Sequence, residues 1–308
     1  MLEVNLCGLK ITSPLILASG ILGVSYSTMI RLFNSGLGAI TTKSIGPIPR
    51  RGYRNPSIVE ITPGTFLNSV GLANPGIDYF ISEIKEIKSH NIPLIVSIFG
   101  DSNKSYLDVA FKAEKAGADA VELNISCPHA EVSSIGIDKK LTYSLVNLLK
   151  QNLKIPIFVK LNPNVTNLID IALAAENGGA DAVIAINTIS AMKIDINTRC
   201  PLLSHGTGGL SGKAVHPIAV KHVYDLYKIL KIPIIGCGGV DSWQDVVEFF
   251  LAGASAVQIG TALHKDISII KNINSGISTY LKLNKVKSIM DIIGFAHQFE
   301  TQEVSECD

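Results

Sequence analysis

The sequence predicts a closed (β/α)8 barrel, and two observations carry this prediction: a strand-like pattern recurs along the chain, and amphipathic helical patterns separate its copies. The chain has 308 residues, of which 47% are hydrophobic and 17% charged, so it is long enough for one large α/β domain. An open, doubly wound sheet would show a similar alternation and stays the alternative. Because no linker interrupts the pattern, we expect a single domain over residues 1–308, with a frayed polar tail over residues 299–308.

The eight expected strands are apolar runs, rich in β-branched residues, that follow a Gly or Pro breaker. They are too short for helices and apolar on both faces, as strands of a covered parallel sheet should be. In chain order they lie in PLILASG (14–20), GLGAITTKS (36–44), NIPLIVSIFG (91–100), AGADAVELNIS (116–126), KIPIFVKLNP (154–163), GGADAVIAINT (178–188), KIPIIGCGGV (231–240) and AGASAVQIGTA (252–262).

Helical patterns lie between these runs. Each clear example begins near a Ser, Thr or Asn cap, carries apolar residues at i, i+3, i+4 and i+7, and ends at Gly. They are SYLDVAFKAEKAG (105–117), TNLIDIALAAENGG (166–179) and SWQDVVEFFLAGA (242–254).

Two connections are longer than a barrel needs, residues 46–76 and 189–215. Both follow expected strands and are rich in Pro, Gly, Asn and Thr. Insertions at the carboxyl ends of barrel strands usually build the substrate pocket, so we expect that role here.

Charge and composition exclude several classes of protein. The formal net charge is +1 and no dense Lys/Arg block occurs, which gives no electrostatic case for nucleic acid or a membrane surface. The N-terminal stretch lacks the pattern of a signal peptide, and no apolar run reaches about 18 residues without a polar break. The five cysteines show no zinc-binding spacing, so we expect no metal site and a cytoplasmic protein with reduced thiols.

Polar residues interrupt the expected strands near their carboxyl ends, where barrels of this type hold their chemistry. Lys43 and Lys160 lie in β-branched runs, and an ammonium pointing into a barrel needs an anion or a bound ligand. Asn68, Asn124 and Asn187 each carry a donor and an acceptor that could read the amide edges of a planar heterocycle. A solvated strand end or a turn is the alternative for each of them.

Glycine-rich turns follow the last two expected strands, and a third lies in GTGGLSG (206–212). Such turns expose backbone N–H groups at the corner where these barrels usually hold phosphate. Plain tight turns are the competing interpretation.

Together these motifs resemble those of class 1 dihydroorotate dehydrogenases. The resemblance runs from about residue 3 to about residue 290 and rests on LASG, TTKS, NSVGLANPG, ELNISCP, FVKLNPN, INT, GGLSG, IIGCGG and AVQIGTALH. It implies an FMN-binding barrel that oxidises dihydroorotate to orotate in pyrimidine biosynthesis. The stretch SCPHAE (126–131) is also similar to the corresponding stretch in archaeal members of the class 1B branch.

The resemblance also implies ligand contacts. It assigns FMN to Ala18, Ser19, Lys43, Ser44, Asn124, Lys160, Asn187, Gly212, Gly238, Gly239, Gly260 and Thr261. It assigns the pyrimidine to Lys43, Asn68, Val70, Gly71, Leu72, Asn124, Asn187 and Thr188. Lys160 would stabilise the negative charge that builds on the reduced flavin ring.

Cys127 matches the catalytic base of the family. A thiolate there is suited to take the C5 proton of dihydroorotate while hydride leaves C6 for the flavin, and Ser126 with a water could relay the proton outward. An inert packed thiol is the alternative. His129 stands where most of the family has an asparagine that contacts the pyrimidine.

Other functions stay open on the same barrel: another FMN-dependent dihydropyrimidine oxidoreductase, a colourless phosphate-binding aldolase or synthase, or a non-catalytic binding protein. Class 1A enzymes use fumarate, whereas class 1B enzymes reach NAD through a second subunit with FAD and an iron–sulfur cluster. This chain has no cluster motif or dinucleotide fingerprint of its own. NAD could therefore be reached only through a partner. The stretches GLANPGI and INTISAMKIDINTR favour class 1B, so we expect an electron-transfer partner and assembly as a homodimer or heterotetramer.

Overall fold

The computed structural model describes residues 1–125 and 135–299, and within them eight parallel strands close into a barrel. The strands are hydrogen-bonded in the order β10-β15-β16-β3-β4-β7-β8-β9, which confirms the predicted fold and rules out an open sheet. Each lies in one of the eight predicted runs. They are β3 (Leu15–Leu17), β4 (Ala39–Thr41), β7 (Leu94–Ile98), β8 (Ala120–Asn124), β9 (Ile157–Lys160), β10 (Ala182–Ala185), β15 (Ile234–Cys237) and β16 (Ala256–Ile259).

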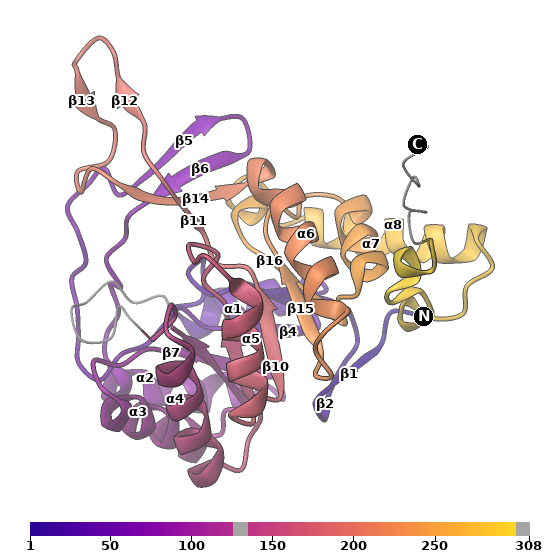
Figure 1. Cartoon of the computed structure of the whole chain (residues 1–308), viewed down its shortest axis with the longest axis horizontal. Coiled ribbons are helices and arrows are strands. Elements are labelled where there is room, and N and C mark those ends of the chain that lie inside the picture. Colours follow the sequence, from indigo (N-terminus) through magenta and orange to yellow (C-terminus); the bar gives the residue numbers. More distant parts are fainter. Residues whose placement is uncertain (126–134, 300–308) are drawn as a thin grey trace, which may run out of the picture.

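Helices form an outer layer around the barrel (Figure 1). Two of the three predicted helices begin at a predicted cap, Asn167 or Ser242, and the third begins earlier than predicted, with Ser102 as its cap in place of Ser105. Each of the three caps accepts a backbone N–H from the first turn. The helices are α1 (Tyr26–Asn34), α2 (Ile77–Ser89), α3 (Asn103–Ala116), α4 (Lys139–Asn152), α5 (Leu168–Asn177), α6 (His216–Tyr227), α7 (Trp243–Ala252) and α8 (Ile269–Leu283), with short 3-10 turns at η1 (Lys213–Val215), η2 (Thr261–His264), η3 (Ile289–Ile292) and η4 (Phe295–Gln298).

The repeated Asp of the GADA motif ties neighbouring strands together at their amino ends. Asp119 accepts the N–H of Leu94 at 2.7 Å, and Asp181 accepts that of Ile157 at 2.9 Å. Each carboxylate also pairs with a lysine of the helix that precedes the neighbouring strand, Lys88 of α2 or Lys150 of α4. The repeated motif therefore marks a repeated contact between neighbouring strands. We call this contact, a carboxylate that accepts an N–H of the neighbouring strand and pairs with a lysine, the Asp joint.

The two long insertions fold together, which the sequence did not indicate. They form a four-stranded antiparallel sheet of β11 (Ile189–Ala191), β14 (Gly208–Gly212), β6 (Thr65–Asn68) and β5 (Ile58–Thr62). The hairpin of β12 (Ile194–Asp195) and β13 (Cys200–Pro201) extends beyond this sheet, away from the barrel (Figure 1). A further hairpin, β1 (Val4–Leu6) with β2 (Leu9–Ile11), precedes the first barrel strand.

The core lies between barrel and helices and continues into the barrel. The interior departs from the aliphatic filling usual in this fold, because polar side chains are buried there. Thr41, Ser97, Glu122, Lys160 and Gln258 are each at most 4% exposed. In the described residues, no helix is long and apolar enough to cross a membrane.

The Asp181 joint yields the first prediction. Asp181→Ala leaves the partly buried N–H of Ile157 without its side-chain acceptor and Lys150 without its partner. We expect the free energy of unfolding to fall by about 1–3 kcal/mol, measured by urea denaturation. Asp225→Ala, which breaks an i,i+4 pair on the surface of α6, is the control and should change it by less than about 0.5 kcal/mol. Equal losses for the two variants would contradict the proposed role of the joint.

Candidate active site

The carboxyl ends of all eight barrel strands meet at one rim, and the two insertions leave the barrel there. Because β11 follows β10 closely and β5–β6 follow β4, the four-stranded sheet lies at the same end. Most of the predicted site residues sit at this rim or on this sheet. The rim is therefore the candidate active site.

Lys160 ends β9 and is 4% exposed. Its ammonium donates to Gln258 Oε1 at 2.8 Å and to Ser19 Oγ at 3.3 Å. Burial opposes the charged form of Lys160, but Cys237 and Glu122 favour it, and its pKa is raised overall. The structure thus holds a charged ammonium at the rim beside Ser19.

Lys43 follows β4 and is half-buried. Burial lowers its pKa, and within the described residues its ammonium forms no hydrogen bond or ion pair. A half-buried lysine in this state gains a partner when an acceptor or anion binds. Its backbone N–H is held by the carbonyl of Gly23 at 2.8 Å.

The structure brings Ser44, Asn124 and Asn187 together from three strand ends. Asn124 Nδ2 donates to Ser44 Oγ at 3.0 Å, and Asn187 Nδ2 lies 3.5 Å from Asn124 Oδ1. Asn187 Oδ1 accepts the backbone N–H of Thr188 at 2.8 Å. This amide cluster, Ser44, Asn124 and Asn187, presents fixed donors and acceptors at the rim.

The insertion sheet brings two more predicted residues together. Asn68 Nδ2 donates to the carbonyl of Gly209 at 3.1 Å. A Cβ at Gly209 would stand 2.1 Å from Thr188 Oγ1, so the glycine lets Thr188 approach the strand. Asn68 and Thr188 therefore flank the same residue of β14.

Val70, Gly71 and Leu72 belong to the first insertion and are anchored by Tyr53. Tyr53 N–H donates to the Val70 carbonyl at 3.1 Å, and a Cβ at Gly71 would meet the Tyr53 ring at 2.8 Å. The Tyr53 ring stacks on His205 of the second insertion, with centroids 3.8 Å apart. The predicted substrate segment is thus fastened to both insertions.

A hollow of about 320 Å³ lies where the glycine-rich turns converge, and Gly212, Gly239 and Thr261 are among its lining residues. Gly239 has φ +70°, and a Cβ there would stand 2.6 Å from that of His216. Lys213 and Lys265 line the same hollow, each paired with a carboxylate, that of Asp241 or Glu60. The close backbone approach suits a phosphate group.

Gly238, Gly260 and Ala18 complete the predicted cofactor set beside this hollow. His216 Nδ1 lies 3.0 Å from the Gly238 carbonyl, which fixes the turn. Gly260 lies beside Ala18, since a Cβ on it would stand 3.4 Å from that of Ala18. In the described part of the chain, His216, Asp245 and Glu248 also place possible metal-ligand atoms within 4.8 Å of one another, which the sequence did not indicate.

Two residues of the predicted site, Ser126 and Cys127, lie outside the described residues, as does His129. Their expected roles therefore remain predictions from sequence.

Sequence reasoning missed the polar residues inside the barrel, above all Glu122 and Gln258. They occupy the same position of the repeated motif, in AVELN and AVQIG, where the third copy AVIAI has Ile184. A polar residue at an otherwise apolar repeat position was the available signal.

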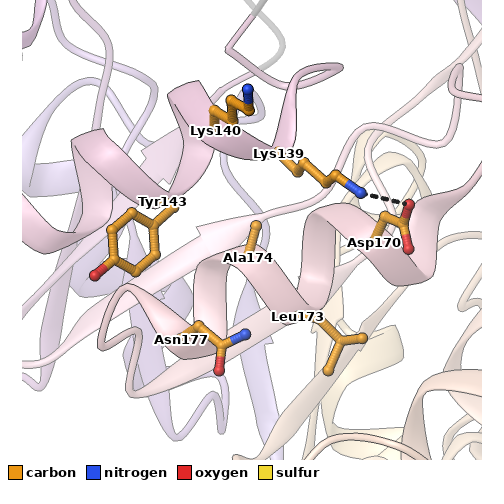
Figure 2. Close-up of a pocket in the computed structure, with 7 residues that line it drawn as sticks. All are labelled: Lys139, Lys140, Tyr143, Asp170, Leu173, Ala174 and Asn177. Atoms are coloured by element: carbon orange, nitrogen blue, oxygen red, sulfur yellow. Dashed lines mark hydrogen bonds and ion pairs between the residues drawn. The ribbon is translucent and has the colours of Figure 1, made fainter.

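A second hollow, of about 420 Å³, lies on the outside between α4 and α5 (Figure 2). Lys139 pairs with Asp170 across it at 3.5 Å, and Tyr143 and Asn177 line its other end. It contains none of the predicted site residues.

Comparisons with known proteins place the chain in a family. The family model described as "Dihydroorotate dehydrogenase" matches residues 1–281. Relatives named "Dihydroorotate dehydrogenase B (NAD(+)), catalytic subunit" include one from Methanocella arvoryzae, 46% identical over 97% of this chain and 98% of its own. Another, from Pyrococcus horikoshii, is 48% identical over 96% of this chain and 98% of its own. The crystal structure of DHODH in complex with ferulenol from Eimeria tenella superposes with a TM-score of 0.85 at 22% identity, covering 97% of this chain and 89% of that one, which supports the fold.

The close backbone approach at Gly239 generates a prediction. Gly239→Ala must push away His216 or the Gly212 carbonyl, so we expect the affinity of the apoprotein for FMN to fall at least about tenfold. Fluorescence titration with FMN measures it. Gly8→Ala is the matched control, because Gly8 also has positive φ but nothing within 4 Å of the added Cβ. Wild-type affinity in Gly239→Ala would contradict the assignment of the hollow.

Proposed function

This chain belongs to the dihydroorotate dehydrogenase family and oxidises dihydroorotate to orotate in pyrimidine biosynthesis; we propose that it does so as an FMN-binding catalytic subunit. The observation that carries the proposal is the match of nearly the whole chain to catalytic subunits of that name. The cluster of a buried ammonium, amides and a glycine-lined hollow at one rim supports it.

The residues at the rim fit FMN. Gly212, Gly238, Gly239 and Thr261 would hold its phosphate, since Gly212, Gly239 and Thr261 line the hollow and their turns offer backbone N–H groups. Ser19 and Lys160 would bind at the flavin ring, where a fixed cation favours negative charge. When bound, FMN supplies a two-electron acceptor for the hydride from C6 of the substrate.

Other residues of the chain would bind and deprotonate the substrate. Lys43 offers an ammonium that has no partner in the described residues, which suits the carboxylate of dihydroorotate. Asn68, Asn124, Asn187 and Thr188 offer the amide and hydroxyl groups that pair with the ring edges. Cys127 takes the C5 proton as its thiolate, and Ser126 assists its release. Loss of that proton and of the C6 hydride leaves the C5–C6 double bond of orotate.

The decisive experiment is anaerobic mixing of the FMN-loaded protein with dihydroorotate, followed by flavin absorbance. We expect the flavin to bleach with dihydroorotate and to stay oxidised with dihydrouracil or dihydrothymine. Bleaching by the latter pair instead would favour another dihydropyrimidine oxidoreductase. A protein without FMN affinity would contradict the proposal altogether.

The base assignment gives a prediction of its own. Cys127→Ser should retain FMN, but serine is a far weaker acid and cannot hold the anion near neutral pH. We expect stopped-flow flavin reduction to slow by about 10² or more. The wild-type rate should rise with pH as the thiol ionises, and the variant should lose that dependence. Cys200→Ser is the control, because Cys200 is exposed on β13 and should keep the wild-type rate.

The electron acceptor gives another prediction. We propose that a separate subunit with FAD and an iron–sulfur cluster passes electrons to NAD. The names of the relatives, which mention NAD(+) and a catalytic subunit, support a separate subunit and NAD. This chain alone, given dihydroorotate, should reduce dichlorophenolindophenol and leave NAD unchanged in an absorbance assay. Reduction of NAD by the single chain would overturn this assignment.

A further inference from the structure

We propose that Glu122 is a positioning residue that orients Lys160 and Asn124 through two hydrogen-bond chains inside the barrel. The proposal rests on the proposed function, because it concerns the groups assigned there to flavin and substrate. Glu122 itself lies below the rim, one inward-facing position before Asn124 on β8.

Because Glu122 is buried, its carboxylate needs hydrogen-bond donors. Its side chain is 0% exposed, and a buried carboxylate without partners is costly. Both oxygens accept hydrogen bonds: Oε2 from Gln258 Nε2 at 2.7 Å and Oε1 from Ser97 Oγ at 3.1 Å. Since β8 and β16 are not neighbours in the barrel, the bond to Gln258 crosses its interior.

The first chain runs to Lys160, and its direction is fixed. An ammonium can donate but never accept, so the Gln258 atom 2.8 Å from Lys160 Nζ must be the carbonyl oxygen. The amide NH₂ of Gln258 then faces Glu122, which must accept. Glu122 thereby sets the orientation of the amide that holds Lys160.

The second chain runs to Asn124 by the same logic. Ser97 gives its single hydroxyl proton to Glu122, so Ser44 must be the donor across the 3.0 Å contact between the two hydroxyls. The Ser44 oxygen then accepts from Asn124 Nδ2 at 3.0 Å. Asn124 is therefore turned with its amide nitrogen inward and its oxygen toward Asn187.

Neighbouring groups also act on Lys160 electrostatically. Two groups favour the charged form of Lys160, Cys237 and Glu122, and burial raises the pKa of the Cys237 thiol, which favours the neutral thiol. Replacing the Glu122 carboxyl group by an amide therefore removes support for the buried ammonium. Buried lysines without such support lose their proton far more easily than exposed ones.

Glu122→Gln removes the charge and keeps the shape, and two variants accompany it. The double variant Glu122→Gln/Gln258→Glu returns one carboxylate to the interior, next to Lys160. Glu114→Gln is the control, because Glu114 accepts two backbone N–H groups outside the barrel interior, from Lys154 and Ile155, and an amide oxygen can still do so.

The first readout is FMN binding by the apoprotein from pH 6 to 9, expressed as the ratio of variant to wild-type Kd. We expect the Glu122→Gln ratio to grow by about tenfold or more with rising pH, as Lys160 loses its proton. The double variant and Glu114→Gln should give flat ratios. A flat ratio for Glu122→Gln would overturn the inference, since a merely structural defect does not depend on pH.

The second readout, urea unfolding over the same pH range, needs no flavin. In Glu122→Gln, Lys160 has a lower pKa folded than unfolded, so the unfolded chain binds more protons. The deficit in stability relative to wild type should then shrink as pH rises, by up to about tenfold in the unfolding constant per pH unit. A deficit that does not change with pH overturns the inference.

The outcomes separate the two proposals. A wild type that fails to bind FMN overturns the proposed function and leaves the urea test of Glu122 in place. If Glu122→Gln cannot fold, the double variant decides: folding and FMN binding support a need for one carboxylate beside Lys160, and failure overturns it.

Discussion

The closed parallel barrel is the constraint on which the site depends. Closure brings all eight strand carboxyl ends to one rim, so residues from Ser19 to Thr261 converge although most of the sequence separates them. The joints made by Asp119 and Asp181 hold neighbouring strands at the opposite end. Stability and chemistry are thereby assigned to opposite ends of the same strands.

Much of this architecture could be predicted from sequence because it is local. All eight barrel strands and the three helices considered could be located from Gly and Pro breakers, β-branched runs and Ser or Asn caps. The lysines at strand ends were visible as charged residues in apolar runs. Periodicity says which face of a strand is apolar. It does not say which side chain on one strand meets which on another.

The features that the sequence did not predict are contacts between residues far apart in the chain. The Gln258–Glu122 bond joins residues 136 apart, and the Asn68–Gly209 bond joins residues 141 apart. The insertions read as loops because their strands are short and pair with each other rather than with the barrel. Ser126, Cys127 and His129 lie outside the described residues, so their roles still rest on sequence.

The internal repeat of the sequence relates the residues that are far apart in the chain and meet inside the barrel. Ser97, Lys160 and Cys237 occupy one position of the IP-containing runs, while Thr41, Glu122 and Gln258 occupy one position of the other runs. These side chains meet inside the barrel, where Gln258 bonds to Lys160 and Glu122, and Glu122 bonds to Ser97. Ser97 reaches Asn124 through Ser44, and Asn187 lies 3.5 Å from Asn124 Oδ1. The orientation of a single rim amide is thus determined both by the barrel interior and by the strand end that leads into the second insertion.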